Sequence, residues 1–198
     1  ADARSSVWIT GAAKPPPWVA ARLGVTPTVA PLPSLLVTRS SEPVVHARAP
    51  VLELPPPEVK IVSDRIAGDE RHLKLRVTSP RAANLFWLAL PAPRIAKVRL
   101  DGRVLPPPGI RHWGDTPGRH NRRRADPATF WTLEAPGIGP EGFELDLVLK
   151  GAKPLAIRIC ELTTGLPPSL ASEHGPMPET LVPYDHGLST LVARELSL

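Results

Sequence analysis

The stretch FWTLEAPGIGPEGFELDLVLKGAKPLAIRICEL, residues 130–162, decides the fold of this chain. It holds two segments in which apolar and polar residues alternate, separated by turns rich in glycine and proline. The alternating apolar positions are Leu145, Leu147 and Leu149 in the first segment and Leu155, Ile157 and Ile159 in the second. Successive side chains of a strand point to opposite faces, so this period of two predicts half-buried strands.

The same signal recurs through the chain. Further strands are predicted at residues 5–10, 35–38, 44–47, 51–54, 58–66, 72–79, 84–90, 96–100, 103–105 and 189–198. The segment 84–90, NLFWLAL, is apolar at every position after Asn84, which is typical of a central strand covered on both faces. Asp101-Gly102 predicts a hairpin turn. A single short helix is expected at residues 18–23, because prolines precede it and Gly24 follows it.

Proline is the outlier of the composition, with 27 of 198 residues. Proline has no backbone donor and fixes φ, so it disfavours long helices and collects in turns and at strand edges. We therefore predict an all-β protein, an antiparallel β-sandwich with one short N-terminal helix and long proline-rich loops. A single domain is expected over residues 1–198. A proline-rich part, 1–57, would pack on the main strands of 58–166, and an irregular tail, 167–198, would end in a final strand.

Charge, cysteine content and hydropathy narrow the class of protein. The net charge of +5 is modest for this length, so a nucleic-acid partner is not expected. The single cysteine, Cys160, excludes an internal disulfide and is expected as a small side chain that is buried or at an edge, near the end of a strand. No apolar stretch is long enough to cross a bilayer. The chain begins at Ala1 without an initiator methionine, so a processed product or a cut-out domain is expected.

Residues 106–128 form a long polar stretch that is predicted to be a loop. Its basic and aromatic residues make it the one possible interaction loop: Arg111, His112, Trp113, Arg119, His120, Arg122, Arg123 and Arg124. Such residues can bind phosphate groups or stack on a base. The alternatives are a solvated loop whose arginines pair with scattered acids, a surface for a protein partner or a lipid headgroup, and a nucleic-acid site.

Catalytic and metal motifs are absent from the sequence. The chain has no His-Glu-x-x-His for zinc and no Gly-x-Ser-x-Gly nucleophile elbow. The piece Gly137-Ile138-Gly139 precedes a strand, so a turn is expected there in place of a phosphate loop. No catalytic residue, metal ligand or cofactor site is therefore predicted. Trp8, Trp87 and Trp131 lie in strand patterns and are expected in the core, whereas Trp113 lies in the polar loop.

Several phrases together resemble one family. They are VWIT, PPPWVAARLG, LKLRVTSPRAANLFWLAL, KVRLDGR, PGIGPEGFELDLVL, LAIRICELTTGLP and STLVARELSL. The pattern is similar to the C-terminal, non-catalytic domain of membrane-bound zinc metallopeptidases of family 28, of the aminopeptidase-like, endoplasmic-reticulum type. The resemblance covers residues 5–24, 58–105, 128–166 and 185–198.

The resemblance implies an accessory domain of a zinc-dependent exopeptidase. Its partners would be the peptidase domain and membrane helices of the same parent chain, with a peptide or protein ligand possible, and its location would be extracytoplasmic (periplasmic). The family's His-x-Asp and paired glutamates do not occur here, so the fragment itself is not expected to be an enzyme. Two alternatives stay open: a carbohydrate-binding β-sandwich that uses Trp113, and a hydrolase assembled from scattered residues.

Overall fold

The computed structural model describes residues 6–10, 15–24, 26–32, 43–105, 130–139, 141–174 and 189–198. Within these residues the chain forms antiparallel strands in three sheets, two short α-helices and one short 3-10 helix, η1 (Ala92–Arg94). The prediction of an all-β protein is therefore confirmed. Among the described residues, no helix is long and apolar enough to cross a membrane.

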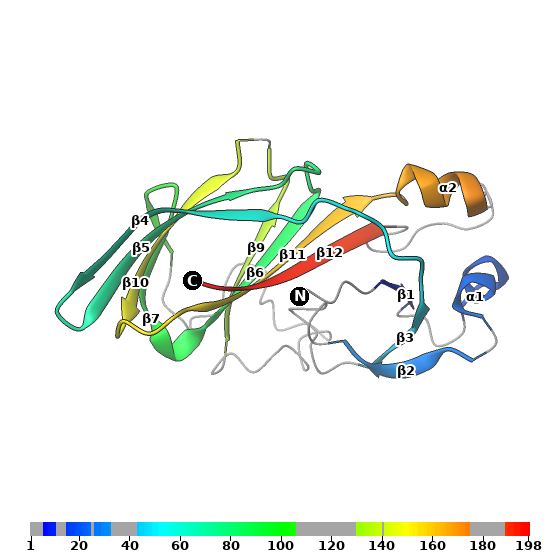
Figure 1. Ribbon diagram of the computed structural model, residues 1–198, viewed down its shortest axis with the longest axis horizontal. Coiled ribbons are helices and arrows are strands. Elements are labelled where there is room, and N and C mark those ends of the chain that lie inside the picture. Colours follow the sequence, from blue (N-terminus) through cyan, green and yellow to red (C-terminus); the bar gives the residue numbers. More distant parts are fainter. Residues whose placement is uncertain are drawn as a thin grey trace, which may run out of the picture.

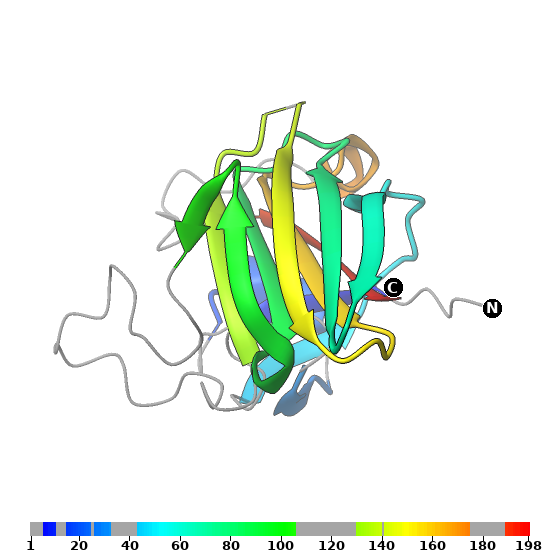
Figure 2. The same cartoon turned by 90° about the vertical axis from the view of Figure 1, so that its left-hand side faces the viewer.

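The larger sheet has five strands in the order β4-β5-β10-β7-β8. Their bounds are β4 Glu58–Ala67, β5 Glu70–Thr78, β10 Phe143–Lys150, β7 Ile95–Leu100 and β8 Arg103–Leu105. β10 lies at the centre, and β5 and β10 bury every second residue as the alternation predicts. Figure 2 looks onto the outer face of this sheet, with β4 as its right-hand strand.

The second sheet has four strands in the order β12-β11-β6-β9. Their bounds are β12 Ser189–Ser197, β11 Ala156–Thr164, β6 Leu85–Pro91 and β9 Phe130–Pro136. β6 is an inner strand between β11 and β9 and is buried over most of its length, as its apolar sequence predicts. The final strand predicted at 189–198 is confirmed by β12.

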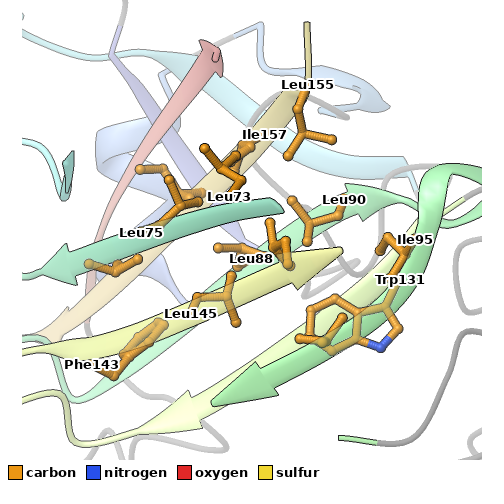
Figure 3. Close-up of a cluster of buried hydrophobic side chains, with 14 of the residues drawn as sticks. Leu73, Leu75, Leu88, Leu90, Ile95, Trp131, Phe143, Leu145, Leu155 and Ile157 are labelled. Atoms are coloured by element: carbon orange, nitrogen blue, oxygen red, sulfur yellow. The ribbon is translucent and has the colours of Figure 1, made fainter. Parts of the chain in front are cut away.

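The two sheets enclose one hydrophobic core (Figure 3). Leu73 and Leu75 of β5 and Leu145 of β10 face Leu88 of β6 and Ile157 of β11 across the gap, and all five are almost completely buried. Each fully buried aliphatic side chain contributes about 1.5–3 kcal/mol relative to leaving it exposed. The alternating stretch quoted first therefore supplies strands to both layers of a β-sandwich.

The N-terminal part forms a separate three-stranded sheet in the order β1-β3-β2. Its elements are β1 Val7–Thr10, β3 Pro43–Arg48, β2 Thr28–Pro31 and the helix α1 Pro17–Leu23. It lies on the side of the four-stranded sheet that faces away from the five-stranded sheet (Figures 1 and 2). β1 and β3 are mostly half-buried, whereas three of the four residues of β2 are exposed. The division of the chain into domains stays a prediction.

Turn geometry explains where the main hairpins reverse. Asp101 and Gly102 both have positive φ, 47° and 78°, which is the type I′ geometry that the Asp-Gly pair predicts. Gly142 precedes β10 at φ 65°, and a Cβ there would lie 1.8 Å from the carbonyl oxygen of Val77. Only glycine fits at that position, because both the backbone conformation and the space exclude a side chain.

The structure corrects three predictions. Residues 51–54, between Pro50 and three prolines, are not a strand, and none of the described strands pairs with them. A second helix, α2 Pro168–His174, occupies part of the tail that was expected to be irregular. Cys160 is fully buried as expected but lies in the middle of β11, since pairing with β12 continues to Thr164. The strand predicted at 35–38 lies outside the described residues.

Candidate protein-binding surface

Strand β4 is the edge of the five-stranded sheet, and among the described strands it pairs with β5 alone. It has ten residues, and the eight from Lys60 to Ala67 are all exposed. The usual alternation of buried and exposed residues is therefore lost, and both faces of the strand are open. The β4–β5 hairpin extends beyond the four-stranded sheet at the left of Figure 1, and Ile61 and Ile66 on its inner face are about half exposed. Long exposed edges of this kind are places where another chain can add a strand.

Apolar residues lie along this exposed edge. Ile61 is 48% exposed, Val62 53% and Ile66 59%. The pairing with β5 shifts register between Ile61 and Ser63, so that Val62 is the extra residue of a β-bulge. Natural edge strands usually carry charges, prolines or bulges that discourage pairing. β4 has the bulge but keeps three exposed apolar side chains, which indicates a surface for contact with another molecule.

An ion pair fixes the middle of β4 to β5. Arg71 Nε donates to Asp64 Oδ1 over 2.9 Å, and Nη2 donates to Oδ2 over 2.6 Å, so the pair is bidentate. Arg71 also donates to the carbonyl oxygen of Leu198, at 3.0 Å, and thereby ties the five-stranded sheet to the edge of the other sheet. The hydrogen bonds from Arg71 lower the pKa of Asp64, and the same bonds raise the pKa of Arg71. The ion pair thus holds the exposed strand against β5 at Asp64.

The outer face of the five-stranded sheet is predominantly basic. The cross-strand registers place on this face Lys60, Arg65, Lys74, Arg76, Lys97, Arg99 and Lys150, against Glu58, Glu70, Glu144 and Asp146. Lys74 Nζ lies 2.7 Å from Glu144, whose hydrogen bond and charge raise the pKa of Lys74. Within the described residues Arg65, Lys97 and Arg99 have no ion-pair partner. The face therefore carries an excess of positive charge that extends to the β4 edge.

The opposite edge of the same sheet differs sharply. β8 has only three residues, so it offers little backbone for strand addition. Its Val104 is 60% exposed, much like Val62 of β4. This similarity makes Val104 a matched control for substitutions on β4.

A buried polar cluster joins the loop after β5 to strand β11. Ser79 Oγ donates to Glu161 Oε2 over 2.6 Å and accepts a hydrogen bond from the backbone N–H of Ala83 at 2.9 Å. Arg81 Nη1 lies 3.5 Å from Glu161 Oε1, and Arg81 also donates to the Thr163 hydroxyl. Glu161 is completely buried. Burial raises the pKa of Glu161 against the opposing effects of Ser79 and Arg81, and burial lowers the pKa of Arg81.

This cluster organises the fold and is not arranged for catalysis. A nucleophilic serine needs a base that takes its proton and access to substrate. Ser79 is 4% exposed and already donates its hydrogen to a carboxyl whose second partner is an arginine. Cys160, on the opposite face of β11, is also buried, and burial raises the pKa of its thiol, so the reactive thiolate is disfavoured.

The residues predicted as a basic interaction loop, Arg111–Arg124, lie outside the described residues. Among the residues that the structure describes, no group of three His, Cys, Asp or Glu side chains could hold a metal ion. The four described tryptophans do not form an exposed row: Trp131 is in the core, and Trp8, Trp18 and Trp87 are half-buried. Trp18 stacks with the guanidinium of Arg22, 3.4 Å above its ring.

The buried Glu161 and the edge strand β4 were not predicted as functional features from the sequence. Glu161 follows Ile157 and Ile159 at the same period, so the pattern itself places a carboxylate on the inner face. The segment EVKIVSDRI was predicted as a strand, but its place at an edge follows only from the pairing of all five strands. Searches against family models, curated proteins and solved structures gave no match for this chain.

Proposed function

We propose that this chain is a non-catalytic accessory β-sandwich that binds extended peptide or protein segments along β4. The observation that carries the proposal is the run of eight exposed residues, Lys60–Ala67, on a ten-residue edge strand. Strand addition gains main-chain hydrogen bonds along the whole edge, while side chains on alternate positions provide specificity. The bidentate ion pair of Arg71 with Asp64 supports the proposal, because it holds β4 in an extended conformation that a partner strand can join.

The parent protein in this proposal is a membrane-bound zinc-dependent exopeptidase of family 28, with the chain on the extracytoplasmic side. The phrases quoted above, from VWIT to STLVARELSL, are its support. In that setting the peptidase domain and membrane helices of the same parent are the natural partners of β4. A substrate peptide presented to the peptidase domain is the other segment that the edge would suit.

The second candidate function is carbohydrate binding. Sugar-binding modules pack exposed aromatic rings against the faces of pyranose rings. Because the described tryptophans are buried or half-buried, this candidate now rests on Trp113. Glycan-array binding that is lost in Trp113→Ala would favour it over the peptide-binding function.

Catalysis is tested on the purified chain with zinc and a panel of aminoacyl chromogenic substrates. The accessory function predicts no turnover above a protein-free blank. Turnover that a chelator abolishes would contradict it.

Binding is tested with an array of immobilised strand-forming peptides of varied sequence and charge. We compare the wild type with Ile61→Asn/Ile66→Asn, which removes the apolar contacts of β4 without changing its charge. The matched control is Val29→Asn/Val104→Asn, which alters two apolar residues elsewhere that are at least as exposed. The proposal predicts peptides whose binding is lost in the β4 variant and kept in the control. An array without any such peptide would overturn it.

A further inference from the structure

We infer that the segment bound by β4 is acidic, with apolar and acidic residues alternating along it, and that it extends the five-stranded sheet as a sixth strand. This inference rests on the proposed function and specifies the chemistry of the partner. It follows from how the two faces of β4 differ in charge and polarity.

The inner face of β4 is apolar where a new strand would lie. Ile61 pairs with Leu75 and Ile66 pairs with Arg71, and both β5 residues point toward the sandwich interior. Ile61 and Ile66 therefore lie on that same side, where they are 48% and 59% exposed. Asp64 shares this side, but its charge is matched by the bidentate Arg71. A neighbouring strand would place apolar side chains against this face to bury the two isoleucines.

The outer face of β4 is basic. Lys60 pairs across the sheet with Arg76, and Arg65 pairs with His72, so Lys60 and Arg65 lie on the outer side. Both are exposed. Lys60 has one acidic neighbour, Glu58 at 3.3 Å, and Arg65 has no ion-pair partner among the described residues. Acidic side chains on the outer face of an added strand would pair with these two cations, because cross-strand neighbours of opposite charge attract.

A single extended peptide can meet both requirements, apolar side chains on the inner face and acidic side chains on the outer face. A strand that alternates apolar and acidic residues presents one kind of side chain to each face. The apolar side chains would lie beside Ile61 and Ile66, and the acidic side chains beside Lys60 and Arg65. A second copy of this chain fits less well, because pairing two β4 edges would extend one basic outer face into another. The net charge of +5 on each copy adds to that repulsion.

The experiment measures fluorescence anisotropy of three labelled twelve-residue peptides. They alternate valine with glutamate, with lysine or with serine, so they share length and strand period and differ in charge. We expect the glutamate peptide to bind about tenfold more tightly than the lysine peptide, with serine between, because Lys60 and Arg65 attract glutamate and repel lysine on the neighbouring strand. Equal binding of the three peptides would overturn the inference.

Reversing the charge of Lys60 and Arg65 tests whether the preference for the glutamate peptide arises at β4. In Lys60→Glu/Arg65→Glu the preference should invert, so that the lysine peptide binds more tightly. The matched control is Lys97→Glu/Arg99→Glu, which makes the same charge change on β7, three strands away on the same face. It should keep the preference for glutamate. If both variants invert the preference equally, the peptides respond to the overall field of the face, and strand addition at β4 is contradicted.

The outcomes separate the inference from the proposed function. If binding depends on Ile61 and Ile66 but not on peptide charge, the acidic partner is contradicted, whereas peptide binding by β4 is supported. If no peptide binds in a way that depends on these isoleucines, both the acidic partner and peptide binding by β4 are contradicted. Sedimentation of the chain alone tests the second copy: a dimer that Ile61→Asn/Ile66→Asn dissociates would show that β4 pairs with itself, and would overturn the acidic partner.

Discussion

Strands β4 and β10 belong to the same sheet and both alternate apolar and polar residues in their sequences. Nevertheless β4 is an exposed edge strand, whereas β10 is the central strand and packs in the core. FELDLVLK in β10 buries Leu145, Leu147 and Leu149 completely or almost so, because β5, β7 and the opposite sheet surround them. EVKIVSDRI in β4 leaves Ile61 and Ile66 about half exposed. Alternation of apolar and polar residues therefore predicts that a strand has one apolar and one polar face. Whether the apolar face is buried depends on the strands that pack against it in the fold.

The largest expected difference in stability is between alanine substitutions at two aliphatic residues, Leu147 and Ile61, which face the same side of the sheet. Leu147→Ala should lower the free energy of unfolding by about 2–5 kcal/mol, because it leaves a cavity in a close-packed core. Ile61→Ala should cost about 1 kcal/mol or less, because that side chain already contacts water. Urea unfolding followed by tryptophan fluorescence measures both. Similar losses in the two variants would show that β4 is covered in solution.

A smaller difference is expected between two arginines. Arg81→Ala removes the cation that lies 3.5 Å from the buried Glu161 carboxyl and should cost about 2–3 kcal/mol, because that carboxyl is then buried without a countercharge. Arg99→Ala on the outer face should change stability by less than about 0.5 kcal/mol. The same unfolding experiment compares them. Equal effects would mean that the buried cluster is not what holds the loop after β5.

The pH dependence of stability should have opposite signs for two carboxyl groups. Burial raises the pKa of Glu161, so its favourable contribution is present below the ordinary glutamate pKa and is lost as pH rises. Arg71 lowers the pKa of Asp64, so its contribution is present above the ordinary aspartate pKa and is lost as pH falls.

Melting temperatures between pH 3 and pH 8 test these signs in two variants. Relative to the wild type, Glu161→Gln should gain stability as pH rises, whereas Asp64→Asn should gain stability as pH falls. Glu195→Gln, on an exposed pair with Arg158, is the control and should follow the wild type. The same slope in both test variants would contradict the assigned environments.

Much of the sandwich could be predicted because its signals are local. Alternation gave β5 and β10, the continuous apolar run gave β6, and Asp101-Gly102 gave the β7–β8 hairpin. Residues 51–54 show the limit: they alternate, but a strand also needs a partner, and none of the described strands pairs with them. The helix α2 was missed because prolines were taken as breakers, although Pro168 at its first position suits a helix start.

The candidate binding surface could not be predicted in the same way. Lys60 and Ile61 are neighbours in the sequence, but their value for binding depends on the edge position of β4 and on the reach of its hairpin beyond the other sheet. The ion pair of Arg71 with Asp64 depends likewise on the hairpin register. Properties that arise from pairing over the whole sheet are invisible to a reading of one segment at a time.

Amide hydrogen exchange, resolved by residue, tests the central claim most directly. In the chain alone, alternate amides of β4 should exchange quickly, because one side of an edge strand donates to water, while those of β10 stay protected. The valine–glutamate peptide should slow the fast amides of β4 and leave β8 unchanged. If the amides of β4 are all as well protected as those of β10 before any peptide is added, the edge is already occupied and the account is wrong.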